Sequence, residues 1–90
     1  MHIGIPKEIK NHEYRVALTP DGAKLLAQAG HAVRIETGAG EAVGYGDDAY
    51  VAAGVAVVAD AAEVWAADLV VKVKEPQPDE VAALREGLIL

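Results

Sequence analysis

Three basic side chains in this acidic chain have the chemistry to bind a small anionic substrate: Arg15, Lys72 and Lys74. Arg15 lies in a dense polar loop, residues 6–20, and the two lysines come at the end of a later apolar run. A guanidinium grips a carboxylate with two parallel hydrogen bonds, and a lysine ammonium can donate to a carbonyl oxygen. Arg15 and Lys74 together therefore suit a small 2-oxo acid. The alternative is that all three are solvated loop charges.

The elements that must position these side chains alternate between strand and helix. Pro6 ends a first strand because it cannot donate to a ladder, Thr19 can cap a helix that starts at Pro20, and glycines end three of the helices. This alternation predicts an α/β fold with a doubly wound parallel sheet, Rossmann-like or flavodoxin-like, with right-handed crossovers and helices on both faces. The expected strands are 2–5, 32–36, 55–58, 68–74 and a fifth that starts at 87 and is truncated at 90; the expected helices are 20–29, 47–53, 60–65 and 78–86.

Local patterns refine several of these elements. Residues 32–36 alternate between apolar and polar, which indicates a strand with one exposed face, near an edge of the sheet. Residues 55–58 are continuously apolar, which indicates a buried parallel strand. One aspartate of the pair 47–48 is expected to cap the second helix. Asp60 and Glu63 have the spacing of a capping box for the third helix.

The two basic clusters are expected to meet at one edge of the sheet. Ligands of open α/β sheets bind outside the carboxyl ends of the strands. Arg15 follows the first expected strand, and Lys74 lies at the tip of the fourth. Residues two apart on a strand share a face, so Lys72 is expected to point the same way as Lys74. In the first loop, Glu8 and Glu13 either orient the basic groups or face solvent.

Residue types exclude several classes of site. The chain has no Cys and no Ser, which excludes disulfides, thiolate chemistry and a Ser-His-Asp mechanism within these residues. The three histidines are scattered without i, i+4 spacing, so no metal site is expected. The glycine-rich stretch 38–44 misses the G-x-G-x-x-G spacing and follows the second strand, so we expect a turn-rich connection and no cofactor-binding residue.

Composition also limits the partners. A net charge of −6 and a pI near 4.8 argue against binding to nucleic acid. The most apolar region, 51–73, is interrupted by Asp60, Glu63 and Asp68, so no membrane span is expected. The first residues do not have the pattern of a signal peptide, and the expected location is the cytoplasm.

The motifs together resemble one family, that of the alanine dehydrogenases and pyridine nucleotide transhydrogenases. Two stretches are similar to its N-terminal signature and three to its next landmarks: Gly4–Glu8, Glu13–Pro20, Gly38–Glu41, Ala53–Val55 and Leu69–Pro76. The resemblance covers essentially all 90 residues, in order. Transhydrogenase members usually carry another residue where Lys74 stands, so this lysine favours the alanine dehydrogenase members.

The resemblance implies an NAD-dependent enzyme that interconverts L-alanine and pyruvate plus ammonia by reversible oxidative deamination. It implies that Arg15 and Lys74 bind the substrate, that NAD is bound mainly by a domain absent from this chain, and that the protein is a homo-oligomer, commonly a hexamer. The family's catalytic histidine is expected beyond Leu90. Residues 1–90 are therefore expected to be the N-terminal part of a substrate-binding domain, without a catalytic residue and inactive alone.

Two other functions stay open. The nucleotide-binding subunit of a proton-translocating NAD(P) transhydrogenase would exchange NAD(H) with a membrane partner and would not depend on alanine. A non-catalytic domain for small acids would bind pyruvate without turnover.

Overall fold

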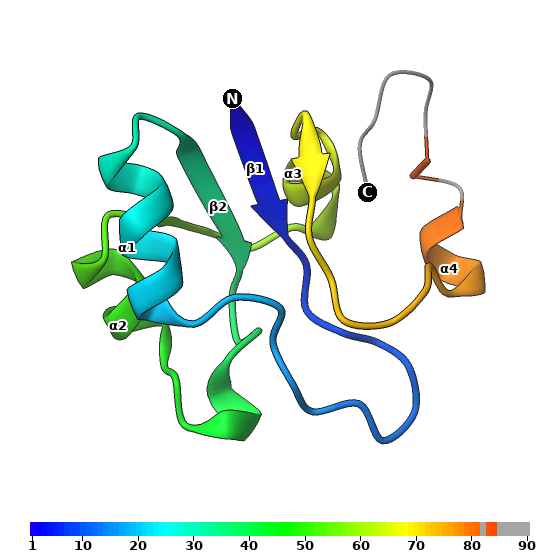
Figure 1. Cartoon of the computed structure of the whole chain (residues 1–90). Helices are drawn as coiled ribbons and strands as arrows, with labels where there is room; N and C mark the ends of the chain where they lie inside the picture. Colours follow the sequence, from blue (N-terminus) through cyan, green and yellow to red (C-terminus); the bar gives the residue numbers. More distant parts are fainter. Residues whose placement is uncertain (82, 85–90) are drawn as a thin grey trace.

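A four-stranded, all-parallel sheet forms the centre of the chain (Figure 1). The computed structural model describes residues 1–81, 83 and 84. The predicted α/β class is confirmed, and the fifth strand expected at 87–90 lies outside the described residues. The elements are β1 (His2–Ile5), α1 (Pro20–Gln28), β2 (Ala32–Glu36), the 3-10 helix η1 (Glu41–Val43), α2 (Asp47–Ala52), β3 (Ala56–Val58), α3 (Ala61–Trp65), β4 (Leu69–Val70) and α4 (Pro78–Val81).

The described strands follow the order β3-β2-β1-β4. This is the Rossmann-like order, and it differs from the flavodoxin-like order, in which β3 would lie beside β1. In the register, Ile3 of β1 is opposite both Val33 of β2 and Leu69 of β4. The chain therefore proceeds from β1 to one side of the sheet and returns to the other side of β1 with β4.

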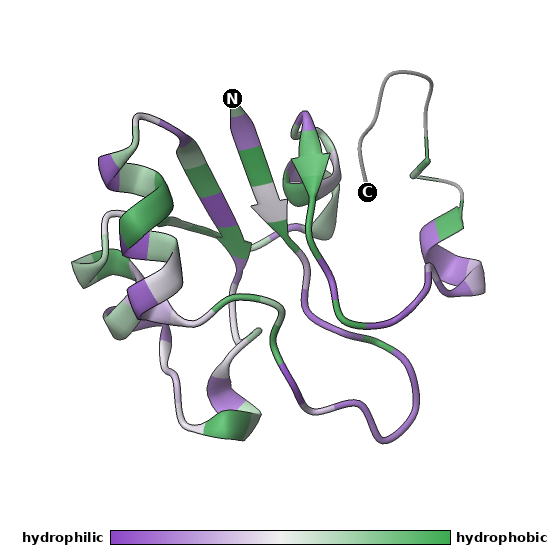
Figure 2. Ribbon diagram, viewed as in Figure 1, coloured by the Kyte–Doolittle hydropathy of each residue, from purple (hydrophilic) through white to green (hydrophobic). Residues whose placement is uncertain are grey.

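Helices cover both faces of the sheet, as predicted. Ile3 and Ile5 point to one face and share a core with α1, α2 and β2, through Ala23, Tyr50, Val33 and Ile35. Gly4 points to the opposite face, where a Cβ atom would lie only 2.3 Å from the carbonyl oxygen of Val64 in α3. Figure 2 shows the matching alternation of hydrophobic and hydrophilic residues along β2.

Helix α1 begins and ends as its sequence predicts. The Thr19 side chain caps the helix by accepting a hydrogen bond from the Gly22 amide at 3.2 Å. The chain leaves the helix through Gly30, whose φ of +97° is costly for other residues. Just before the helix, the buried Tyr50 hydroxyl of α2 donates to the Leu18 carbonyl oxygen at 2.7 Å. This bond fixes the end of the loop that carries Arg15.

Strand β3 corrects the prediction of a buried strand at 55–58. Ala56 is exposed and Val57 and Val58 are half-buried, because β3 is at one edge of the described sheet and pairs only with β2. Val55, which precedes β3, is the buried residue of this run. Strand β2 lies inside the sheet, next to this edge strand.

Strand β4 is much shorter than the predicted 68–74. Its ladder with β1 ends where the Val71 amide donates to the Gly4 carbonyl oxygen at 3.0 Å, because β1 itself ends before Pro6. The next amides, those of Val73 and Lys74, donate to the carboxylate of Glu8. The prediction that Lys72 and Lys74 share a strand face is therefore wrong.

Of the two other predicted caps, the one for α2 is wrong, and the one for α3 is confirmed in its position but not in its side-chain bonds. Gly46, not an aspartate, is the N-cap of α2, and Asp47 instead accepts from Thr37 and Gly38. Asp60 is the N-cap of α3, but its side chain makes no capping hydrogen bond; its backbone carbonyl accepts from the Glu63 amide.

Helix α4 ends at Val81, and Ala83 and Leu84 are not helical. The other residues of the predicted 78–86 helix, 82, 85 and 86, lie outside the described residues. Within the described part of the chain, no helix has the length and apolar character needed to cross a membrane.

Candidate functional site

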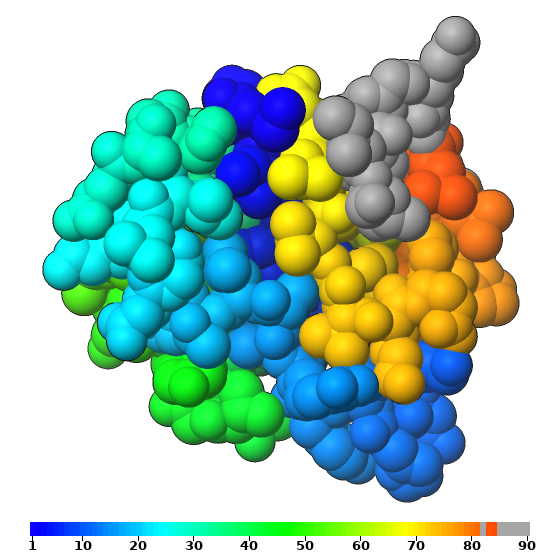
Figure 3. Space-filling view, in the orientation of Figure 1, coloured from blue at the N-terminus to red at the C-terminus, as the bar shows by residue number. Residues whose placement is uncertain are grey.

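The strand order brings two distant loops together at the carboxyl edge of the sheet. Residues 6–19 leave β1 and residues 71–77 leave β4, and these two strands are neighbours. β2 and β4 lie on opposite sides of β1, so the strand order reverses between β1 and β4, and open α/β sheets bind ligands at such a switch point. Figure 3 shows the two loops side by side on one face of the molecule.

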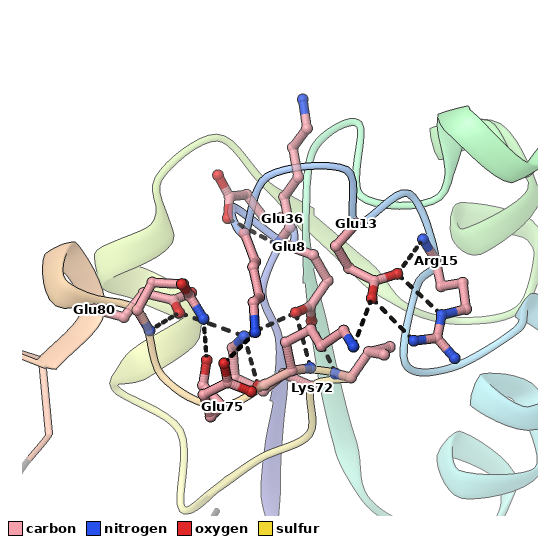
Figure 4. A network of polar contacts seen from close by, with 12 residues as sticks. Glu8, Glu13, Arg15, Glu36, Lys72, Glu75 and Glu80 are labelled. Carbon is pink, nitrogen blue, oxygen red and sulfur yellow. Dashed lines mark hydrogen bonds and ion pairs between the residues drawn. The ribbon is translucent and has the colours of Figure 1, made fainter.

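Arg15 is held in this loop by Glu13. The guanidinium Nε and Nη2 donate to the two carboxylate oxygens at 3.0 Å each, and the Arg15 amide donates to the same carboxylate at 3.0 Å (Figure 4). These hydrogen bonds lower the pKa of Glu13 from 4.5 to about 2, and the pairing raises the pKa of Arg15. The Arg15 side chain is 64% exposed while that of Glu13 is only 5% exposed. The Nη1–Nη2 edge of Arg15 is thus the edge that can take a second carboxylate.

Lys74, from the loop after β4, approaches the same carboxylate. Its Nζ is 3.9 Å from Glu13 Oε1, and its side chain is 38% exposed. The structure thus brings Arg15 and Lys74 together around Glu13, although they come from different loops. It also resolves the alternative left open for Glu13, whose carboxylate orients the basic groups.

An open pocket of about 450 Å³ lies beside Arg15. Its walls come from the first loop, from the η1 region and from the chain after β4, and they include Val16, Ala17, Tyr45 and Val71. Mostly apolar walls with a few polar groups are typical of small-molecule sites. Lys74 lines a neighbouring hollow, which shares Val71, Lys72 and Val73 with this pocket.

Lys72 is placed differently from the prediction. Its side chain is only 3% exposed and forms ion pairs with Glu8 and Glu80. Glu8 is thus an orienting residue and not a solvent-facing one. The sequence pattern did not indicate Glu80. The feature that could have indicated Glu80 is its three-residue spacing from Gln77, which is that of a capping box. In the structure the Gln77 amide donates to the Glu80 carboxylate at 2.9 Å.

The described residues offer little to a metal or a phosphate. They contain no group of three His, Cys, Asp or Glu side chains that could hold a metal ion. In the glycine-rich loop, the Gly38 amide donates to the Asp47 carboxylate at 2.9 Å, which places a negative charge where a phosphate would need a donor. Gly40 is required there by packing, because a Cβ atom would lie 2.8 Å from the Tyr45 carbonyl oxygen.

Comparison with known proteins gives the relatives of this chain. Residues 4–90 match the family model of the alanine dehydrogenase/PNT N-terminal domain. The alanine dehydrogenase of Bacillus subtilis (strain 168) is 53% identical over 90 residues, which are all of this chain and 24% of that protein. The alanine dehydrogenase of Halomonas elongata is 54% identical over 91 residues, again 24% of that protein.

Two solved structures are also similar. A structure of L-alanine dehydrogenase superposes with a TM-score of 0.93 at 50% identity, over 94% of this chain and 24% of that one. A transhydrogenase from Sinorhizobium meliloti superposes with a TM-score of 0.91 at 34% identity, over 98% and 25%. The chain spans about a quarter of the length of these relatives. It belongs to the family of alanine dehydrogenase/PNT N-terminal domains.

Proposed function

We propose that the protein carrying this chain is an NAD-dependent L-alanine dehydrogenase, which interconverts L-alanine with pyruvate and ammonia. Residues 1–90 would be the N-terminal part of its substrate-binding domain. The observation that carries the proposal is the cluster of Arg15, Glu13 and Lys74 at the carboxyl edge of β1 and β4. The identity of about half to the alanine dehydrogenases of two bacteria supports it.

Arg15 is proposed to hold the carboxylate of the substrate. Glu13 occupies the Nε–Nη2 edge of the Arg15 guanidinium, so the substrate carboxylate would bind to the Nη1–Nη2 edge. Two parallel hydrogen bonds fix the orientation of a carboxylate as well as its position. The Cα atom next to it is then held in one geometry for hydride transfer.

Lys74 is proposed to donate to the substrate oxygen on the carbon that changes oxidation state. In pyruvate this is the carbonyl oxygen, and in the carbinolamine it is the hydroxyl oxygen. An ammonium at this place stabilises the negative charge that develops on oxygen. Glu13 is unsuited to be the proton-transfer base, because its pKa of about 2 makes it a very weak base. We propose that a residue outside this cluster is the base.

NAD supplies the hydride acceptor when it is bound. The glycine-rich loop does not suit its pyrophosphate, because the Gly38 amide already donates to the Asp47 carboxylate. We therefore propose that the main NAD site lies in another part of the protein. We further propose that the protein is a cytoplasmic homo-oligomer, commonly a hexamer in this family. Size-exclusion chromatography with light scattering would test the oligomeric state.

Kinetics of two variants of the full protein test the site. Arg15→Ala is expected to raise the KM for pyruvate by roughly ten- to a hundredfold, because charged hydrogen bonds contribute about 1.5–3 kcal/mol each. Lys74→Ala is expected to lower kcat by a similar factor, because it removes a contact that strengthens in the transition state. The measurement is NADH oxidation with pyruvate and ammonia.

Lys7→Ala is the matched control. Lys7 lies in the same loop and is exposed, but it lines neither the pocket beside Arg15 nor the hollow beside Lys74. Its kinetics should equal those of the wild type. If Arg15→Ala and Lys74→Ala also behave as the wild type, the assignment of the site is wrong.

The second candidate is a transhydrogenase subunit, which the similarity to the Sinorhizobium meliloti structure favours. The presence of Lys74 argues for the dehydrogenase, because transhydrogenase members usually carry another residue there. The two functions differ in their dependence on substrate. NADH formation that requires L-alanine supports the dehydrogenase, whereas NAD(H) exchange that is indifferent to L-alanine supports the transhydrogenase.

A further inference from the structure

Three charged side chains, Glu8, Lys72 and Glu80, form a cluster from three separate segments (Figure 4), and this cluster contacts the backbone of Lys74. Glu8 follows β1 and its side chain is 1% exposed, while Lys72 follows β4 and is 3% exposed. Glu80, from α4, is also buried. Lys72 Nζ donates to Glu8 Oε1 at 2.8 Å and lies 3.4 Å from Glu80 Oε1.

The pair of Glu8 and Lys72 holds the backbone of Lys74 from both sides. The Lys74 amide donates to Glu8 Oε1 at 3.2 Å, and the Lys74 carbonyl oxygen accepts from Lys72 Nζ at 3.0 Å. The Val73 amide donates to the other oxygen of Glu8 at 3.0 Å. Because β4 ends at Val70, these bonds take the place of a strand ladder at the residue whose side chain enters the site.

Glu8 also ties Lys74 to Arg15, since Glu8 and Arg15 lie in the same loop after β1. The distance between the two substrate-binding side chains therefore depends on the bond between this carboxylate and the 73–74 backbone. A need for stability alone does not explain the cluster, because a buried ion pair is often no more stabilising than well-packed apolar residues of similar size. A requirement to hold one backbone position does explain it.

We propose that Glu8 and Lys72 are positioning residues, which act on the reaction through Lys74. This role rests on the proposed function. The pair fixes the Lys74 backbone so that its ammonium reaches the substrate oxygen from a constant position. A displacement of about 1 Å can cost a hundredfold in rate, so the loss of either partner is expected to affect kcat more than binding of the substrate.

The test uses Lys72→Met and Glu8→Gln in the full protein, with pyruvate, ammonia and NADH as reactants. Lys72→Met keeps the length of the side chain but removes the donor to the Lys74 carbonyl oxygen. Glu8→Gln keeps the shape and replaces the charged acceptor. Each variant is expected to lower kcat by roughly ten- to a hundredfold, with the KM for pyruvate within about threefold of the wild type because Arg15 is intact.

A double variant separates positioning from general damage. If Lys72 acts through Lys74, Lys72→Met combined with Lys74→Ala should be no slower than Lys74→Ala alone. Val64→Ala is the matched control for lost stability, because this residue is buried in α3 on the opposite face from α1. It should lower the thermal midpoint and leave kcat near the wild-type value.

Several results would overturn the proposal. One is a wild-type kcat in both single variants, and another is a double variant whose losses multiply. If Lys72→Met does not fold, the milder Glu8→Gln variant decides alone through its kcat. Failure of the proposed function looks different: the wild type itself would then show no NADH oxidation that depends on pyruvate and ammonia, and the role of the pair would fall with it.

Discussion

At the scale of single residues, the charge around Glu13 decides what the site can accept. One carboxylate lies between two cations, Arg15 and Lys74, so the cluster carries one excess positive charge. That excess would match the single carboxylate of the proposed substrate. The sequence left open whether Glu13 faces solvent, because two-residue spacing in an irregular loop carries no periodicity. In the structure its side chain is only 5% exposed, and it pairs with Arg15 of the same loop and with Lys74 of the loop after β4.

The titration of Glu13 is the prediction that belongs to this scale. Its pKa is about 2 in the folded protein against an ordinary value of 4.5, chiefly because of the side-chain hydrogen bonds from Arg15. The folded-state pKa is lowered, so the contribution of the pair to stability is complete above pH 4.5 and is lost as the pH falls toward 2. Carbon-13 NMR of the glutamate Cδ atom measures this pKa directly.

Two variants of the full protein assign the cause. Arg15→Gln should return the pKa of Glu13 most of the way to 4.5, because Arg15 is the principal donor. Lys74→Met should raise it only slightly, since Lys74 acts on Glu13 through charge alone, from 3.9 Å. A Glu13 pKa near 4.5 in the wild type would show that the two side chains are not paired in solution.

At the scale of elements, the sequence predicts where a helix or strand ends only if neighbouring residues cause that end. Helix α1 begins directly after its predicted cap, Thr19, and the chain leaves it through Gly30, as predicted. Strand β4 does not follow its sequence, because its length depends on where β1 ends and on the Glu8 carboxylate, which captures the next amides. Neither cause is visible within residues 68–74.

The burial of a strand is likewise predicted only where its cause lies in the neighbouring sequence. The apolar run 55–58 reads as a buried strand, but β3 has only β2 as a neighbour among the described strands. Position at an edge is a property of the strand order, and composition does not record it. The candidate site shows the same limit, since Arg15 and Lys74 were predicted to meet but the burial of Lys72 was not.

The prediction at this scale concerns the contact between β1 and α3. A methyl group at Gly4 would lie 2.3 Å from the Val64 carbonyl oxygen, which belongs to the helix backbone and cannot move cheaply. Gly4→Ala is therefore expected to lower the free energy of unfolding by about 3 kcal/mol or more. The measurement is the thermal midpoint of the full protein by calorimetry.

Gly46→Ser is the comparison variant for this contact. Gly46 has open space around its Cα atom and an ordinary φ of −73°, and serine is a favoured N-cap residue for α2. Its thermal midpoint should equal or slightly exceed that of the wild type. Equal midpoints for Gly4→Ala and the wild type would mean that α3 does not pack this closely on the sheet.

At the scale of the whole molecule, the strand order creates the site. An alternation of strands and helices predicts a parallel sheet but does not distinguish Rossmann-like from flavodoxin-like order. In the flavodoxin-like order β3 would lie between β1 and β4, and the loops with Arg15 and Lys74 would not leave adjacent strands. The order β3-β2-β1-β4 therefore decides whether two residues far apart in sequence can bind one small acid.

Chemical cross-linking tests this order. The Lys10 ammonium and the Glu75 carboxylate form an exposed ion pair between the loop after β1 and the loop after β4. A carbodiimide couples an amine to a carboxylate that it touches, so mass spectrometry of a digest should find these two residues joined. The buried Glu8–Lys72 pair should stay uncoupled, because the reagent cannot reach it. Glu75→Gln should abolish the cross-link. If the wild type yields no such cross-link, the two loops do not lie together in solution. Arg15 and Lys74 would then be too far apart to form the proposed site.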